Sequence, residues 1–129
     1  MQKNNPLERE ALKDAVQSAI ASNSIEGIQL SPESLAILKR VADGEISTEE
    51  ARQKMLQQIE VWKKEYPDYF WQGEIIPDPN DPYVYAGTDI LINKFGIIDP
   101  RFLMEVEGFF VTTRIIELRM NSTKGVLSV

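Results

Sequence analysis

Apolar residues recur at helical spacing between residues 7 and 25. Four of them follow the spacing i, i+4, i+7, i+8: Leu12, Val16, Ala19 and Ile20. Gly27 follows closely, and glycine takes the left-handed conformation with which helices often end. The pattern predicts a first helix over residues 7–25.

A second helix is predicted over residues 32–43. Ser31 is placed to cap it, and Pro32 stands at the first helical position, where a missing N–H costs nothing. The apolar stripe consists of Leu35, Leu38 and Ala42, widened by Val41.

A third helix is predicted over residues 48–64. Ser47 and Glu50 have the spacing of a capping box. The stripe expected to be buried is Ala51, Met55, Ile59 and Trp62. Three short helices with one apolar side each pack most simply against one another, so residues 1–64 are expected to form a small helical unit.

The composition changes after residue 64. The stretch EYPDYFWQGEIIPDPNDP, residues 65–82, is rich in proline and aromatic residues. Helix cannot continue through such a run of prolines. We expect an ordered, extended connecting segment that lies on a surface.

A fourth helix is predicted from Pro100 to about Met120, with Asp99 as its N-cap. Its main stripe is Phe102, Val106, Phe109, Thr113 and Ile116, extended by Leu103, Phe110, Ile115 and Leu118. An apolar arc this wide needs more than one small neighbouring element to bury it, so we expect this helix to be incompletely covered. The expected fold class is all-α, divided into residues 1–64, 65–82, 83–121 and a tail, 122–129.

The composition is that of a globular protein, with 43% hydrophobic and 26% charged residues among 129. No apolar run is long enough to span a bilayer, and the first residues, MQKNNPLERE, do not resemble a secretory signal. We therefore expect a cytoplasmic protein without a membrane partner.

The chain contains neither cysteine nor histidine. This excludes thiolate nucleophiles, Ser-His and Cys-His catalytic pairs, and the usual metal ligands. We expect no catalytic residue, no metal site and no cofactor. The net charge is −6, and no basic stripe is present, which argues against nucleic acid as a partner.

The end of the first predicted helix carries an unusual carboxylate. Ser22 and Glu26 are four residues apart on one helical face, and Gly27 then ends the helix. A carboxylate at a helix C-terminus faces the negative end of the helix dipole and is available to an outside cation, for which arginine has the best geometry. The alternative is an ordinary solvated helix end.

Ser22-x-x-x-Glu26-Gly27 resembles the inhibitory motif of Fic-family adenylyltransferases, and residues 19–59 resemble the small bacterial VbhA-type antitoxins that inhibit Fic toxins. The resemblance implies that Glu26 pairs with an arginine of the toxin's catalytic loop and obstructs the site of the ATP γ-phosphate. It implies that Ser22 positions the helix and that Gly27 ends it without a clash. Contacts with the toxin would come from Leu35, Leu38, Met55 and Ile59, each of which has a place in the chain's own core as the alternative.

Residues 81–119 resemble the N-terminal entry segment of Fic domains. The matching positions are Tyr83, Tyr85, Gly87, Thr88, Leu91, Asn93, Lys94, Gly96, Ile97 and Asp99, whereas Ala86 replaces the family's proline. The Fic catalytic loop, H-x-F-x-[D/E]-G-N-G-R, is absent. The resemblance therefore implies a protein that is not itself an enzyme.

The expected function is that of an antitoxin that binds a Fic adenylyltransferase and inhibits AMPylation. The first alternative is a truncated, inactive N-terminal part of an antitoxin-fused Fic adenylyltransferase. The second is an unrelated helical interaction protein.

Overall fold

The computed structural model describes residues 6–128, and their side chains over residues 7–121. The elements are α1 (Pro6–Ile25), α2 (Pro32–Ala42), α3 (Thr48–Glu65), a 3-10 helix η1 (Pro67–Tyr69), β1 (Pro77–Asp78), β2 (Asp81–Tyr85) and α4 (Pro100–Ser128). The first three helices lie within one or two residues of their predicted bounds. No helix in the described part of the chain has the length and apolar character that crossing a membrane requires.

The helix starts agree with the predicted capping residues. The Ser31 hydroxyl accepts a hydrogen bond from the Ser34 N–H at the start of α2. Ser47 and Glu50 form both bonds of the capping box before α3. The Asp99 carboxylate accepts the Phe102 N–H at the start of α4. Each cap satisfies a backbone N–H that has no partner within its helix.

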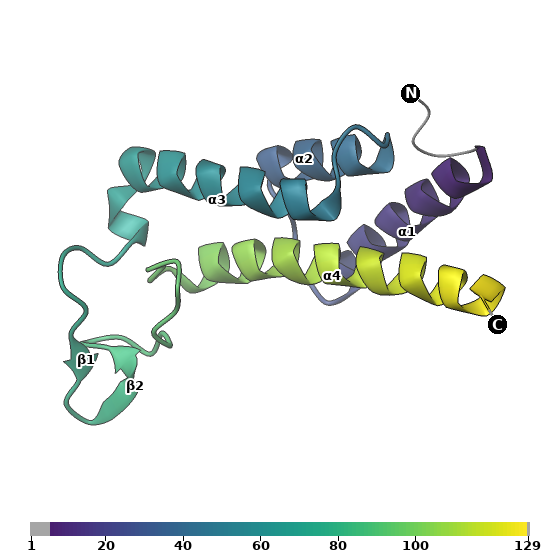
Figure 1. The fold of residues 1–129 in the computed structure, drawn as a ribbon. Helices are drawn as coiled ribbons and strands as arrows, with labels where there is room; N and C mark the ends of the chain where they lie inside the picture. The colour runs from purple at the N-terminus through teal and green to yellow at the C-terminus, as the bar shows by residue number, and fades with distance from the viewer. Residues whose placement is uncertain (1–5, 129) are drawn as a thin grey trace.

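Helix α4 is the longest helix, and two of the other helices pack against it (Figure 1). Both α1 and α3 contact it, and α2 lies against α1 and α3. The core lies between them and contains the predicted α3 stripe together with residues of the other helices: Ala15, Val16, Ala19, Leu38, Val41, Ala51, Met55, Ile59, Trp62, Val106, Phe109 and Ile116.

The expectation that α4 lacks cover is wrong for most of its apolar arc. Val106, Phe109 and Ile116 are buried, because α1 and α3 fold back onto α4. Exposed large apolar residues remain on α4 at every seventh position, namely Met104, Val111 and Leu118. The helix also continues beyond its predicted end, to Ser128. Residues 121–128 contain no proline, so every residue retains an N–H for the helix.

The prediction of an all-α fold needs correction, because β1 and β2 form a small antiparallel sheet. The hairpin lies at one end of the molecule, away from α1 (Figure 1). Local hydrogen bonds attach the connecting segment to the residues before α4: the Trp71 N–H donates to the Gly96 carbonyl, and the Ile98 N–H donates to the Tyr69 carbonyl. The prolines that exclude helix here leave the backbone extended, which is compatible with strand pairing.

Arg52 connects α3 to α4. Its guanidinium donates hydrogen bonds to the Glu117 carboxylate at 2.8 Å and to the Thr113 hydroxyl at 3.1 Å. The Thr48 hydroxyl donates to the same carboxylate at 2.6 Å. The hydrogen bonds from Arg52 and then from Thr48 hold the pKa of Glu117 below its usual range.

Since folding lowers this pKa, the interaction stabilises the fold at pH values above the unfolded pKa of about 4.3, and the stabilisation is lost as pH falls through the lower folded value. We expect the thermal midpoint of the parent protein to fall more steeply below about pH 5 than that of Glu117→Gln. Thermal unfolding followed by circular dichroism at a series of pH values measures this difference. Glu33→Gln, at an exposed position on α2, is the control and should keep the parent's slope. Equal slopes for parent and Glu117→Gln would contradict the assignment.

Candidate inhibitory site at the end of α1

The turn after α1 places Glu26 at the tip of the helix. The Glu26 N–H donates to the Asn23 carbonyl at 3.1 Å, and the Ile28 N–H donates to the same carbonyl at 2.8 Å. Gly27 has a φ of 84°, in the left-handed region. Among the described residues, apart from Gly27 and its two neighbours, no atom lies within 4 Å of a Cβ built there, so the backbone conformation and not lack of space favours glycine.

The Glu26 side chain is exposed. Within the described residues its carboxylate forms neither an ion pair nor a hydrogen bond. Arg101 of α4 lines a hollow of about 430 Å³ together with Gly27, yet it makes no ion pair with Glu26. The carboxylate therefore remains available to a cation from outside. Ser22 is half-buried one turn earlier, and its carbonyl accepts the Glu26 N–H at 3.3 Å.

The four residues predicted to contact a toxin differ in exposure. Leu38, Met55 and Ile59 are buried in the core of this chain, which is the alternative that the sequence left open. Leu35 is 40% exposed, because it lies on the side of α2 that faces away from the core. In this conformation only Leu35 among the four has a surface to offer a partner.

The residues predicted as Fic-like mainly organise the loop before α4. The Tyr85 side chain is buried and stacks on Trp71 at 5.2 Å, and its hydroxyl donates to the Asn93 carbonyl. The Asn93 side-chain oxygen accepts the N–H groups of Phe95 and Ile97. Each of these bonds satisfies a polar group in an irregular segment.

The other Fic-like residues have smaller roles. Gly87 has a φ of 74°, and the Thr88 hydroxyl donates to the Tyr85 carbonyl. Lys94 lies over the Phe95 ring, with Nζ 5.3 Å from its centroid. Tyr83 is exposed.

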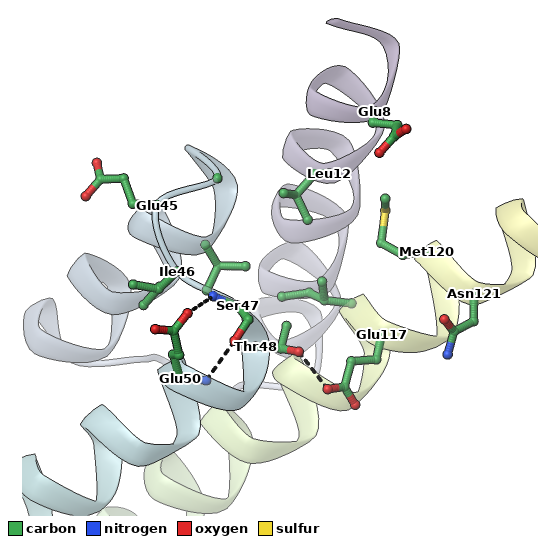
Figure 2. Close-up of a pocket in the computed structure, with 13 residues that line it drawn as sticks. Glu8, Leu12, Glu45, Ile46, Ser47, Thr48, Glu50, Glu117, Met120 and Asn121 are labelled. Carbon is green, nitrogen blue, oxygen red and sulfur yellow. Dashed lines mark hydrogen bonds between the residues drawn. The ribbon is translucent and has the colours of Figure 1, made fainter. Parts of the chain in front are cut away.

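A separate hollow of about 460 Å³ lies at the opposite end of α1, between the start of α1, the α2–α3 turn and the later part of α4 (Figure 2). Its labelled polar side chains largely bind one another: Ser47 and Glu50 form the capping box, and Thr48 donates to Glu117. These hydrogen bonds cap α3 and connect it to α4. The candidate motif does not line this hollow; Gly27, next to Glu26, lines the other one, of about 430 Å³.

Asn23 lies within the motif and was not singled out by the sequence analysis. It continues the spacing of Val16 and Ala19 and therefore falls on the apolar side of α1. A polar residue at a core position was the available signal, because buried amides need partners. The structure buries Asn23, with only 4% of its surface exposed.

Residues 13–58 match the family model "Antitoxin VbhA". The antitoxin-matching region contains Glu26 and the whole of α2, and it ends within α3. The match indicates an antitoxin role, and hence a toxin as partner, for this part of the chain. It does not extend to the hairpin or to α4. Comparison with curated proteins and with solved structures gave no significant match.

Proposed function

We propose that this chain is an antitoxin that binds a Fic adenylyltransferase and inhibits AMPylation. One observation carries the proposal: an exposed carboxylate without a partner among the described residues stands at the tip of α1, inside the antitoxin-matching region. Residues 1–64 are the proposed antitoxin unit. Ser22, Glu26 and Gly27 are the proposed inhibitory motif.

The proposed mechanism is electrostatic and steric. Glu26 lies just beyond the C-terminal end of α1, where the helix dipole disfavours negative charge. A guanidinium of the toxin's catalytic loop relieves this repulsion and forms a charge-assisted, bidentate pair with the carboxylate. The same arginine is then unavailable to the ATP γ-phosphate. The carboxylate also occupies the space that this phosphate needs, and its negative charge repels the phosphate.

The second candidate is the catalytically inactive N-terminal part of an antitoxin-fused Fic adenylyltransferase. It is favoured by the packing of α1 against α4, which joins the antitoxin-matching region to the segment that resembles a Fic entry segment. Without histidine, this part has no base with which to deprotonate a target hydroxyl in the manner of the Fic loop. This part would be inhibitory at most.

An inhibition assay tests the proposal. The purified chain is added in increasing amounts to a purified Fic adenylyltransferase from the same genome, with its target protein and labelled ATP. We expect transfer of AMP to the target to stop near one equivalent of the chain, and we expect the two proteins to co-elute in gel filtration. If the toxin neither co-elutes nor loses activity, the trans-acting function is wrong. Inhibition by the chain only when it is fused to the toxin supports the second candidate.

A further inference from the structure

The turn that carries Glu26 is attached to α4 on both sides. Before the turn, the Asn23 side-chain N–H group donates to the Gly108 carbonyl at 3.2 Å and also to the Thr112 hydroxyl. After the turn, the Ser31 backbone N–H donates to the Glu105 carboxylate at 2.8 Å. Three residues of α4 spaced by three and four positions therefore hold the segment between α1 and α2.

Gly108 allows the segment that follows α1 to approach α4 closely. A Cβ built on Gly108 lies 2.7 Å from Cγ2 of Ile28, closer than side chains tolerate. Ile28 is the second residue after Glu26. A larger residue at position 108 therefore requires the Ile28 side chain to shift.

The buried side-chain amide of Asn23 is hydrogen-bonded in only one orientation of α1. Its N–H group is inaccessible to water and is satisfied by Gly108 and Thr112 in this orientation of α1. Turning α1 about its axis breaks these bonds and leaves a buried polar group without partners. Glu26 follows Asn23 by three residues, so the same rotation changes the direction of its carboxylate.

We propose that Asn23, held by Gly108 and Thr112, is a positioning residue that sets the direction in which Glu26 is presented. This inference rests on the proposed function, and it also supplies a role for α4 in inhibition. Residues 83–121 do not lie in the antitoxin-matching region. Their helix nevertheless orients the inhibitory carboxylate, so the Fic-like segment contributes to presentation of the motif.

The test uses the full chain and two readouts. The variants are Asn23→Ala, Gly108→Ala, and Gly108→Ala combined with Ile28→Ala, in which the new Cβ occupies the space that the Ile28 methyl group leaves. Ser24→Ala is exposed on the same turn and is the matched control. Val41→Ala, in the core of α2, controls for a loss of stability that leaves the motif untouched.

The first readout is hydrogen exchange of the Ile28 amide in the free protein, since that amide is bonded to the Asn23 carbonyl. The second is the concentration that halves AMP transfer by the toxin. We expect Asn23→Ala and Gly108→Ala to raise both the exchange rate and the half-inhibitory concentration about tenfold, the effect of losing one buried hydrogen-bonded contact. The double variant should recover most of both losses. Ser24→Ala and Val41→Ala should inhibit like the parent.

The outcomes separate this inference from the proposed function. If Glu26→Gly fails to inhibit while Asn23→Ala inhibits like the parent, the positioning role is wrong and the proposed function stands. If Val41→Ala, at an equal loss of thermal midpoint, weakens inhibition as much as Asn23→Ala, Asn23 has only a structural role. If the parent inhibits no Fic enzyme, the proposed function fails. If, in addition, the Ile28 amide exchanges at the same rate in Asn23→Ala as in the parent, the contact between Asn23 and α4 does not hold the turn.

Discussion

Replacing Glu26 by glutamine is expected to remove most of the inhibition while leaving the fold intact. The side chain is exposed and has no partner among the described residues, so the free energy of unfolding should change by less than about 0.5 kcal/mol. Truncating one member of a desolvated charge pair costs about 2–5 kcal/mol of binding, which corresponds to at least about thirtyfold in half-inhibitory concentration. Titration of AMP transfer with parent and variant measures the difference.

Glutamine preserves the size of the side chain and removes its charge, so it separates the electrostatic mechanism from simple occlusion. Glu33→Gln, at another exposed acidic position in the antitoxin-matching region, is the matched control and should inhibit like the parent. Glu26→Gly should be inactive as well. If Glu26→Gly inhibits as tightly as the parent, occlusion by the helices accounts for inhibition and the role assigned to the carboxylate is wrong.

Replacing Phe109 by alanine should give the largest loss of stability. Phe109 is fully buried in α4 between the covering helices, and its ring meets that of Phe110 edge to face at 5.6 Å. Truncating a buried phenylalanine to alanine costs about 3–5 kcal/mol, because transfer free energy is lost and a cavity remains. Small domains have about 5–15 kcal/mol in all, so the variant should be close to unfolding at growth temperature. Urea denaturation followed by far-UV circular dichroism measures the loss.

Val111→Ala is the control, because Val111 lies on the exposed side of the same helix and its truncation should cost little. Equal losses for the two variants would mean that α4 is not covered by α1 and α3 as described. Inhibition by Phe109→Ala at low temperature, where it remains folded, should resemble that of the parent.

The helices of the first half were predictable because their signals are local. Ser47 and Glu50 meet within one turn, and the stripe Ala51, Met55, Ile59 and Trp62 lies on one side of α3 whatever the helix packs against. Such interactions need only the helical period and the first turn. The prediction for α3 was confirmed in its start and in its buried face.

Predictions that depended on distant partners were less successful. The apolar arc of α4 was expected to lack cover, because the pattern of apolar residues along one helix does not predict how many other helices pack against it. For Leu35 and Leu38 the sequence left both a toxin contact and a place in the core open, and the structure buries only Leu38. The hairpin was missed because β1 is two residues long and carries no alternating pattern of its own.

By itself, the sequence determined where all four helices begin and where the first three end, and it placed a glutamate on a helical end that a glycine terminates. These features follow from the period of the backbone and from contacts within four residues. The tertiary structure decided what surrounds that glutamate. Asn23 bonds to residues 85 and 89 positions away, and Gly108 admits Ile28 at the same crossing. The direction of Glu26 depends on this crossing of α1 and α4, because helix orientation is set by packing between distant segments and not by the local period.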